Sequence, residues 1–217
     1  MNEHIVILDF GSQYTQVIAR RIRECKVYSI IIHYNTPAAE IAKMNPSGII
    51  LSGGPSSVYA KAAPLPDESI FDLGVPVLGI CFGLQVMARF LKGKVERGQK
   101  REYGKGTLRV RSARCRLFDG LPRELQVWNS HGDKLTRLPD GFKPVATTEN
   151  SAFAAIENAQ ARFYGLQFHP EVVHTPKGKK IISNFVHKIC GCGRKWTMRN
   201  YVEQAVQDIR TQAGREK

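Results

Sequence analysis

Two different patterns of apolar and polar residues divide the chain near residue 93. Before it, short apolar runs alternate with amphipathic stretches. The apolar runs predict buried strands at 4–8, 27–33, 48–51 and 75–80. The stretches between and after them predict helices at 15–24, 37–44, 66–73 and 82–91. Such regular alternation predicts a parallel sheet with right-handed crossovers and helices on both faces.

Beyond Gly93 the helical spacing gives way to short strand patterns separated by Gly, Pro, Asn and Asp. We expect strands at 104–111, 125–128, 143–148, 152–157 and 163–168. No helix-length pattern separates them, so they are predicted to be antiparallel or mixed, extending the sheet and adding a side ribbon. Helices are predicted at 177–189 and 197–210. The second is capped by Thr197 and has an apolar stripe formed by Met198, Tyr201, Val202, Ala205, Val206 and Ile209. The predicted fold class is therefore α/β, an open and mostly parallel central sheet with this extension.

Composition places the chain among soluble globular proteins. It has 217 residues, of which 42% are hydrophobic, and no apolar run approaches the roughly 20 residues that cross a bilayer. The N-terminus enters a strand without the flanks of a signal peptide, and five cysteines are an odd count that favours reduced thiols. We therefore expect a cytoplasmic protein without a membrane partner.

The formal net charge of +13 raises nucleic acid as a partner, but the basic residues are dispersed. The tightest group is Arg109, Arg111, Arg114 and Arg116. We interpret this group as a solvated face of a sheet. The alternative is a contact surface for an acidic partner or a phosphate-bearing ligand. We expect no nucleic acid as a partner. Cys190 and Cys192 near His187 lack a second ligand pair, so no metal site is predicted.

The most informative stretch is the junction between the strand at 75–80 and the helix at 82–91. Cys81 lies at this junction between Gly79 and Gly83, the layout of a nucleophile elbow. The N–H groups at the start of the helix would favour a thiolate and stabilise an oxyanion. A buried structural cysteine is the alternative, and the two glycines favour the elbow.

Two further segments carry groups that would complete such a site. His169 and Glu171 flank Pro170 in a segment predicted to end a strand. In an extended chain both side chains face one way, and the carboxylate can orient the imidazole as a proton relay. The alternative is a surface turn, and the sequence does not show whether His169 approaches Cys81. The N–H groups of Gly54 and Phe82 could form an oxyanion hole, although Gly53-Gly54-Pro55 alone is only a turn signal.

These motifs together resemble the class I (triad) glutamine amidotransferases, which have a flavodoxin-like fold. The segment 79–85 resembles the nucleophile motif of this family. His169-Pro170-Glu171 resembles the rest of the family's triad, and the segment 53–55 resembles its oxyanion strand. The segments 9–15 and 128–134 further resemble the amidotransferase domain of GMP synthetases. The tail from Trp196 resembles the connection to the ATP-pyrophosphatase (synthetase) domain, so we expect an amidotransferase domain at 1–192 and a linker at 193–217.

The resemblance implies a function and a set of site residues. Cys81, His169 and Glu171 would hydrolyse glutamine through a cysteinyl thioester, with Gly54 and Phe82 as the oxyanion hole. Gln85, Gly132 and Asp133 would hold glutamine, and His131 with Asp133 would couple the site to the synthetase domain. That domain, in cis or as a separate subunit, would convert XMP to GMP with the released ammonia.

The resemblance also implies where other ligands bind. ATP and magnesium are expected only on the synthetase domain, because the Ser-Gly-Gly-x-Asp phosphate loop is missing here, and no cofactor is expected in this chain. Two alternatives remain open. One is another enzyme with the same fold, either a cysteine peptidase or an amidotransferase that delivers ammonia to a different acceptor. The other is a non-catalytic basic binding module.

Overall fold

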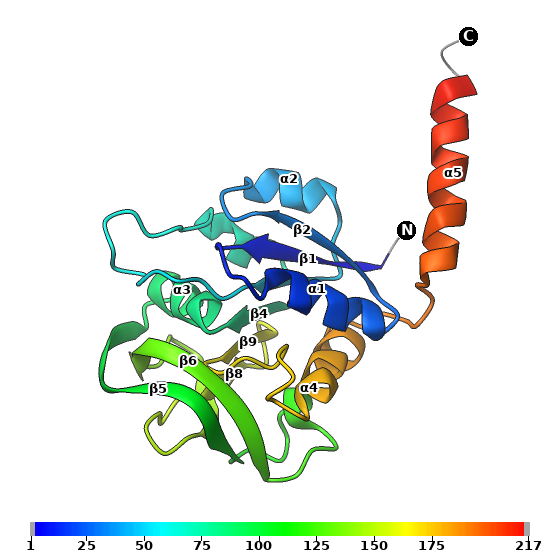
Figure 1. The fold of residues 1–217 in the computed structure, drawn as a ribbon. Coiled ribbons are helices and arrows are strands. Elements are labelled where there is room, and N and C mark those ends of the chain that lie inside the picture. Colours follow the sequence, from blue (N-terminus) through cyan, green and yellow to red (C-terminus); the bar gives the residue numbers. More distant parts are fainter. Residues whose placement is uncertain (1–2, 215–217) are drawn as a thin grey trace.

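The structure, a computed structural model, describes residues 3–214 and contains a nine-stranded sheet with the order β2-β1-β3-β4-β9-β8-β7-β5-β6 (Figure 1). The strands are β1 (His4–Asp9), β2 (Tyr28–His33), β3 (Gly48–Leu51), β4 (Val77–Ile80), β5 (Lys94–Val110), β6 (Glu124–Arg137), β7 (Lys143–Thr147), β8 (Ala155–Asn158) and β9 (Phe163–Leu166). The predicted fold class is confirmed, because the first five strands in this order are parallel and the rest are antiparallel.

Alternate residues of the parallel strands point into two separate hydrophobic cores. Ile5 and Ile7 of β1 pack with α1 (Thr15–Glu24) and α4 (Gly178–Asn184). Val6 and Leu8 pack on the opposite face with α2 (Ala38–Lys43) and α3 (Phe82–Phe90). The sheet is thus the middle layer between two layers of helices, as expected for parallel strands.

The strand β2 departs from its prediction. Its apolar run suggested a strand covered on both faces, but β2 is the edge strand and most of its residues are only half-buried. Because an edge strand has one neighbour, it cannot be enclosed as fully as β1 or β3. The apolar pattern did not distinguish these two positions.

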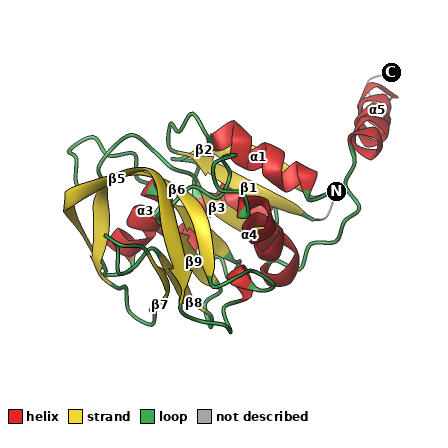
Figure 2. Cartoon of the chain, turned by 60° about the horizontal axis from the view of Figure 1, so that its bottom comes forward, coloured by secondary structure: helices red, strands yellow, loops and turns green. Residues whose placement is uncertain are grey.

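The antiparallel half contains a long ribbon formed by β5 and β6 (Figure 2). Only Arg109 and Val110 of β5 pair with β7, so the rest of the ribbon extends away from the sheet. Both strands are longer than predicted. The added part of β5 is rich in charged residues and glycine and carries little period-2 pattern, which is typical of a ribbon with an exposed face.

Two predicted helices differ locally from an α-helix. The 66–73 segment forms the 3₁₀ turn η1 (Glu68–Asp72), in which the Asp67 carboxylate accepts from the N–H of Ser69. The 177–189 segment forms α4 and continues as the π-helical turn η3 (Phe185–Ile189). Both have a buried apolar face, since Ile70, Phe71 and Phe185 lie in the core.

The last helix, α5 (Met198–Gly214), projects away from the body of the molecule (Figures 1 and 2). It begins as predicted, because the hydroxyl of Thr197 accepts from the N–H of Asn200. Its predicted apolar stripe is not buried: Met198 is 60% and Ile209 63% exposed. The side chain of Ala205 lies outside the described residues.

Within residues 3–214, no helix has both the length and the apolar character needed to cross a membrane.

Candidate active site

Cys81 occupies the sharp turn between β4 and α3, as the elbow prediction requires. Its backbone φ is 52°, in the left-handed region that non-glycine residues seldom adopt. A Cβ added at Gly79 would lie 2.6 Å from the carbonyl oxygen of Gly83, and one at Gly83 only 2.2 Å from that of Leu51. Both glycines are therefore required by close backbone approaches, and the predicted elbow geometry is confirmed.

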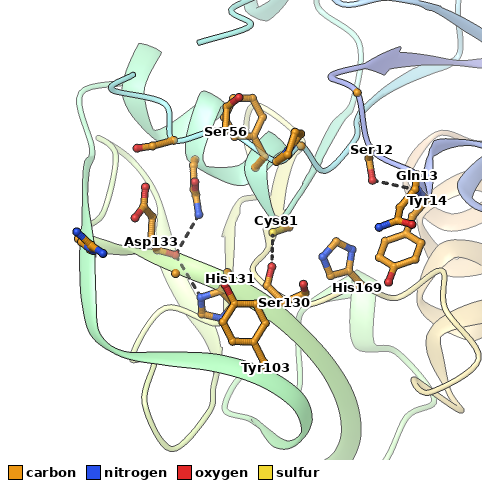
Figure 3. Close-up of a pocket in the computed structure, with 18 of the residues that line it drawn as sticks. Ser12, Gln13, Tyr14, Ser56, Cys81, Tyr103, Ser130, His131, Asp133 and His169 are labelled. Carbon is orange, nitrogen blue, oxygen red and sulfur yellow. Dashed lines mark hydrogen bonds between the residues drawn. The ribbon is translucent and has the colours of Figure 1, made fainter. Parts of the chain in front are cut away.

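The thiol of Cys81 is buried and faces a wall formed by β6. Its S–H donates to the carbonyl oxygen of Ser130 over 3.7 Å (Figure 3). The backbone N–H groups of the first turn of α3 lie next to it, and they have no partners within the helix. A thiolate at this position would be stabilised by the positive end of the helix.

His169 and Glu171 lie together as predicted, although not on a strand. The ring Nδ1 of His169 is 2.8 Å from Oε1 of Glu171, and both side chains are almost wholly buried. The strand β9 ends at Leu166, so the His-Pro-Glu segment follows the strand instead of ending it, which corrects the prediction.

Tertiary hydrogen bonds hold this segment in place of a sheet ladder. The N–H of His169 donates to the carbonyl of Trp128, and the hydroxyl of Thr175 donates to the carbonyl of His169. The guanidinium of Arg21 donates to the carbonyl of Glu171. A segment fixed on three sides in this way can hold its two side chains as firmly as a strand.

The charge state of His169 is set by its two neighbours. Burial lowers the pKa of His169, but its hydrogen bonds with Cys81 and Glu171 act in the opposite direction and raise the pKa to about 11. The imidazole therefore lies beside the sulfur on one side and the carboxylate on the other. Glu171 fixes Nδ1, so Nε2 remains for proton exchange with the thiol.

Gly54 and Phe82 are neighbours across the site. A Cβ at Gly54 would contact the Phe82 ring at 3.1 Å, and the ring of Phe10 packs against Phe82 with centroids 5.5 Å apart. The two residues predicted to form an oxyanion hole are thus brought together beside Cys81.

A cavity of about 840 Å³ opens above these groups. Its walls come from the loops after β1, β3 and β4 and from the β5–β6 ribbon. The lining includes Ser12, Tyr14, Gly54, Cys81, Gln85, Tyr103, Ser130, His131, Gly132, Asp133 and His169. The carboxyl edge of the parallel strands was the predicted place for a ligand, and the cavity lies there.

The predicted glutamine-binding residues are joined by a shared hydrogen-bond acceptor. The side-chain amide of Gln85 donates to the carbonyl of Asp133 over 3.0 Å, and Nδ1 of His131 lies 3.2 Å from the same oxygen. Gln85 therefore links α3 to β6. His131 is buried, with Nε2 3.1 Å from Oε2 of Glu102. Its side chain does not face outward, and its predicted role in coupling to another domain stays a prediction.

Several residues of the site were not anticipated from the sequence. The ring of Tyr14 packs edge-on against His169 at 5.2 Å, Ser130 faces the thiol, and Glu102 pairs with His131. The contact of Glu102 with His131 could be predicted only from the pairing of β5 with β6, in which the two residues are directly opposite. That pairing cannot be derived before the ribbon is known.

Two other predictions concern residues remote from the cavity. The four arginines at 109–116 are exposed, and Arg109 pairs with Glu124, as expected of a solvated face. Nδ1 of His187 lies 2.7 Å from the carbonyl of Cys192, so this nitrogen faces the backbone. Among residues whose positions are described, no group of three His, Cys, Asp or Glu side chains is arranged to hold a metal.

Comparison with known proteins agrees with the fold. The family model for glutamine amidotransferase class-I matches residues 6–189. The chain therefore belongs to the class-I glutamine amidotransferase family.

Within that family the chain is most informatively compared with GMP synthases. It is 50% identical to a glutamine-hydrolysing GMP synthase of Aquifex aeolicus over 97% of this chain, and 50% identical to that of Carboxydothermus hydrogenoformans over 100%. These alignments cover 41% and 42% of the two relatives. The chain thus spans about two-fifths of the length of these curated relatives.

Solved structures give the same fold. A candidate GMP synthase subunit from Thermoplasma acidophilum superposes with a TM-score of 0.79 at 31% identity, covering 88% of this chain and 95% of that one. A glutamine amidotransferase from Thermotoga maritima gives a TM-score of 0.70 at 21% identity, covering 88% of this chain and 100% of that one, and supports the fold alone.

Proposed function

We propose that this chain hydrolyses glutamine to glutamate and ammonia, and that the ammonia is used by an ATP-pyrophosphatase (synthetase) part to convert XMP to GMP. The observation that carries the proposal is Cys81 on a strained elbow beside the buried His169–Glu171 pair, at the base of a cavity. The chain is 50% identical to GMP synthases over nearly its whole length, which supports XMP over other molecules as the acceptor of the ammonia.

In the first half of the reaction, the sulfur of Cys81 attacks the side-chain carboxamide carbon of glutamine. During the attack the proton is held on His169, whose imidazolium is stabilised by Glu171. The developing oxyanion accepts hydrogen bonds from the N–H groups of Gly54 and Phe82. Such donors contribute roughly 10²–10³ in rate in other acyl-transfer enzymes.

In the second half, His169 returns the proton to the departing nitrogen and ammonia leaves. A γ-glutamyl thioester then remains on Cys81. Water, deprotonated by His169, attacks the thioester carbon, and the C–S bond breaks to give glutamate and the thiol. The same imidazole serves as acid and base, which its position between sulfur and carboxylate supports.

The amino-acid end of glutamine is held by the β6 side of the cavity. The carbonyl of Asp133 is already an acceptor for Gln85 and His131. The remaining groups there, the carboxylate of Asp133 and the N–H groups near Gly132, are suited to an α-ammonium and an α-carboxylate. Gln85 holds this wall through its amide and borders the cavity itself.

We further propose that residues 1–192 form the amidotransferase domain and that 193–217 lead to the synthetase part, in cis or as a separate subunit. The unburied stripe of α5 supports this division, because an exposed apolar helix face is suited to packing against further protein. ATP and magnesium would bind on that part. Five free cysteines support a reducing compartment such as the cytoplasm.

The test combines this chain with a purified synthetase domain of a GMP synthase, XMP and Mg-ATP. We expect GMP to form with glutamine as the nitrogen source. With Cys81→Ala, GMP should form only when ammonium is supplied, since the synthetase part remains intact. Ammonium-dependent GMP without any glutamine-dependent GMP from the wild-type chain would contradict the proposal.

A further inference from the structure

A buried contact between a glutamate and a histidine lies behind the cavity wall, away from Cys81, His169 and Glu171. Glu102 of β5 and His131 of β6 are directly opposite in the antiparallel ribbon. They are 8% and 6% exposed, and Nε2 of His131 lies 3.1 Å from Oε2 of Glu102. Polar and ionisable side chains removed from water in this way are costly unless each has a partner, so the pair calls for an explanation.

Glu102 is itself fixed by a third element. The hydroxyl of Thr148, just after β7, donates to the carboxylate, with distances of 3.0 and 3.2 Å to its two oxygens. The same hydroxyl accepts from the N–H of Ser151. The carboxylate is therefore held between β6 and the turn after β7 and cannot turn away from His131 without breaking these bonds.

The neighbours of His131 determine which ring nitrogens carry protons. Nδ1 faces the carbonyl oxygen of Asp133, which can only accept, so Nδ1 must carry a proton to make a hydrogen bond. Nε2 faces the carboxylate of Glu102. Burial raises the pKa of Glu102, yet its interactions with His131 and Thr148 leave the pKa below the usual value. The carboxylate therefore lies against Nε2 and leaves Nδ1 for the Asp133 carbonyl.

The Nδ1 proton acts on the wall of the glutamine cavity. The carbonyl of Asp133 receives both this proton and the amide of Gln85, which fixes the orientation of the backbone after Asp133. Ser130, the residue before His131, presents its carbonyl to the thiol of Cys81. Figure 3 shows Ser130, His131 and Asp133 along one wall. A change in His131 would therefore move the groups proposed to hold the substrate.

We propose that Glu102 is a positioning residue for glutamine: it holds His131 as the Nδ1–H donor that fixes the Asp133 carbonyl and the cavity wall from Ser130 to Asp133. This inference rests on the proposed glutamine hydrolysis. Glu102 does not touch the reacting atoms, so it acts on binding of glutamine more than on the chemical step. The alternative is that the pair contributes only to stability of the ribbon.

The test compares Glu102→Ala with a matched loss of a buried carboxylate elsewhere in the sheet. Glu157 of β8 is 4% exposed and does not border the glutamine cavity, so Glu157→Ala is the control. We expect Glu102→Ala to raise the KM for glutamine about tenfold or more, the loss of roughly one hydrogen bond, while kcat changes less. Glu157→Ala should leave KM unchanged.

A conservative variant that restores the KM for glutamine distinguishes a positioning role of Glu102 from a role in packing alone. The amide of a Gln at this place can donate to Nε2 of a neutral His131, which leaves the proton on Nδ1. Glu102→Gln is therefore expected to restore KM to within about threefold of the wild type. An unchanged KM in Glu102→Ala, or an equal rise in Glu157→Ala, would overturn the proposal.

Nitrogen-15 NMR of the histidine rings tests the same proposal without any activity and without a variant at Glu102. In the wild-type chain we expect His131, assigned by its loss in His131→Gln, to carry a slowly exchanging Nδ1 proton. An unprotonated Nδ1 would overturn the proposal even if the Glu102 variants failed to fold. If the wild type hydrolysed no glutamine, the proposed function would fail, while this measurement would still decide whether His131 is the Nδ1–H donor that the role of Glu102 requires.

Discussion

At the scale of single residues, the reactivity of Cys81 depends on His169 more than on any other side chain. His169 lies between the sulfur and Glu171, and no water layer separates the imidazole from the carboxylate at 2.8 Å. The pair can therefore take and return one proton without moving. Two predictions follow from this arrangement, one for rate and one for stability.

Replacing His169 with Gln removes the acid–base group while keeping a polar side chain of similar size. We expect kcat for glutamine hydrolysis to fall by about 10²–10⁴, the usual contribution of such a group. His174→Gln is the control, because His174 is exposed and stacks on Trp128 at 4.4 Å. Ammonia release under saturating glutamine measures both. A His169→Gln chain with near-normal kcat would show that another group moves the proton.

The raised pKa of His169 also predicts how stability varies with pH. Because the folded pKa of about 11 exceeds the ordinary 6.5, the charged ring stabilises the fold fully below pH 6.5. This contribution is lost as pH rises toward 11, by at most roughly 1.4 kcal/mol per pH unit. The wild type should therefore lose more unfolding free energy than His169→Gln between pH 7 and 10.

Urea unfolding of both chains at several pH values measures that difference. Lysines, tyrosines and the other cysteines titrate in both proteins, so their effects cancel in the comparison. Parallel curves for the two chains would mean that His169 does not carry a raised pKa in the folded state.

The sequence predicted the residues of the candidate site better than their environment. Cys81, His169 and Glu171 each lie in a local motif, and those motifs could be found without a fold. Glu102 and Tyr14 could not be found in that way, because their importance depends on contacts made across strands and loops. A buried glutamate has no local pattern that distinguishes it from an exposed one.

At the scale of elements, the elbow depends on the close approach of α3 to β3. The Cβ of an alanine at Gly83 would meet backbone atoms of Leu51 at 2.2 and 2.7 Å. Backbone atoms cannot shift as the end of a side chain can. Gly83→Ala is therefore expected to destabilise the chain by about 3 kcal/mol or more, at the upper end of the cost of overpacking.

Gly214→Ala provides the control for that change, because nothing lies within 4 Å of its added Cβ. We expect its unfolding free energy to stay within about 0.5 kcal/mol of the wild type. Chemical denaturation of the two variants makes the comparison. Equal stabilities would mean that α3 can move away from β3 at little cost, contrary to the elbow described above.

The sequence predicted the parallel half of the fold more accurately than the antiparallel half. The helix α1 and the strand β3 have the predicted bounds, since an amphipathic pattern defines the first and a continuous apolar run the second. The ribbon of β5 and β6 was underestimated, because one face is exposed and its charged residues obscure the alternation. Pairing between distant strands, not local preference, defines its length.

At the scale of the whole molecule, α5 stands apart from the body. Its described packing on the body includes Tyr201 stacked on Tyr28 at 5.4 Å, and the preceding Trp196 lies near the same ring. A chain ending at Thr197 is therefore expected to keep its unfolding free energy within about 1 kcal/mol, since little apolar surface leaves the core.

The shortened chain should also associate less with itself, because it lacks the exposed Met198, Val202, Val206 and Ile209. Sedimentation and urea unfolding measure the two effects. A loss of several kcal/mol on truncation would show that α5 is an integral part of the amidotransferase domain, and would contradict the proposed boundary near residue 192.

The central claim is that the sulfur of Cys81 attacks the side-chain carbonyl of glutamine, and a diazoketone analogue of glutamine tests it most directly. Peptide mapping by mass spectrometry should find one adduct, on Cys81, which excess glutamine prevents. Cys115→Ala should label as the wild type does, and Cys81→Ala should not label. Glutamine-protected labelling that persists in Cys81→Ala would contradict the account.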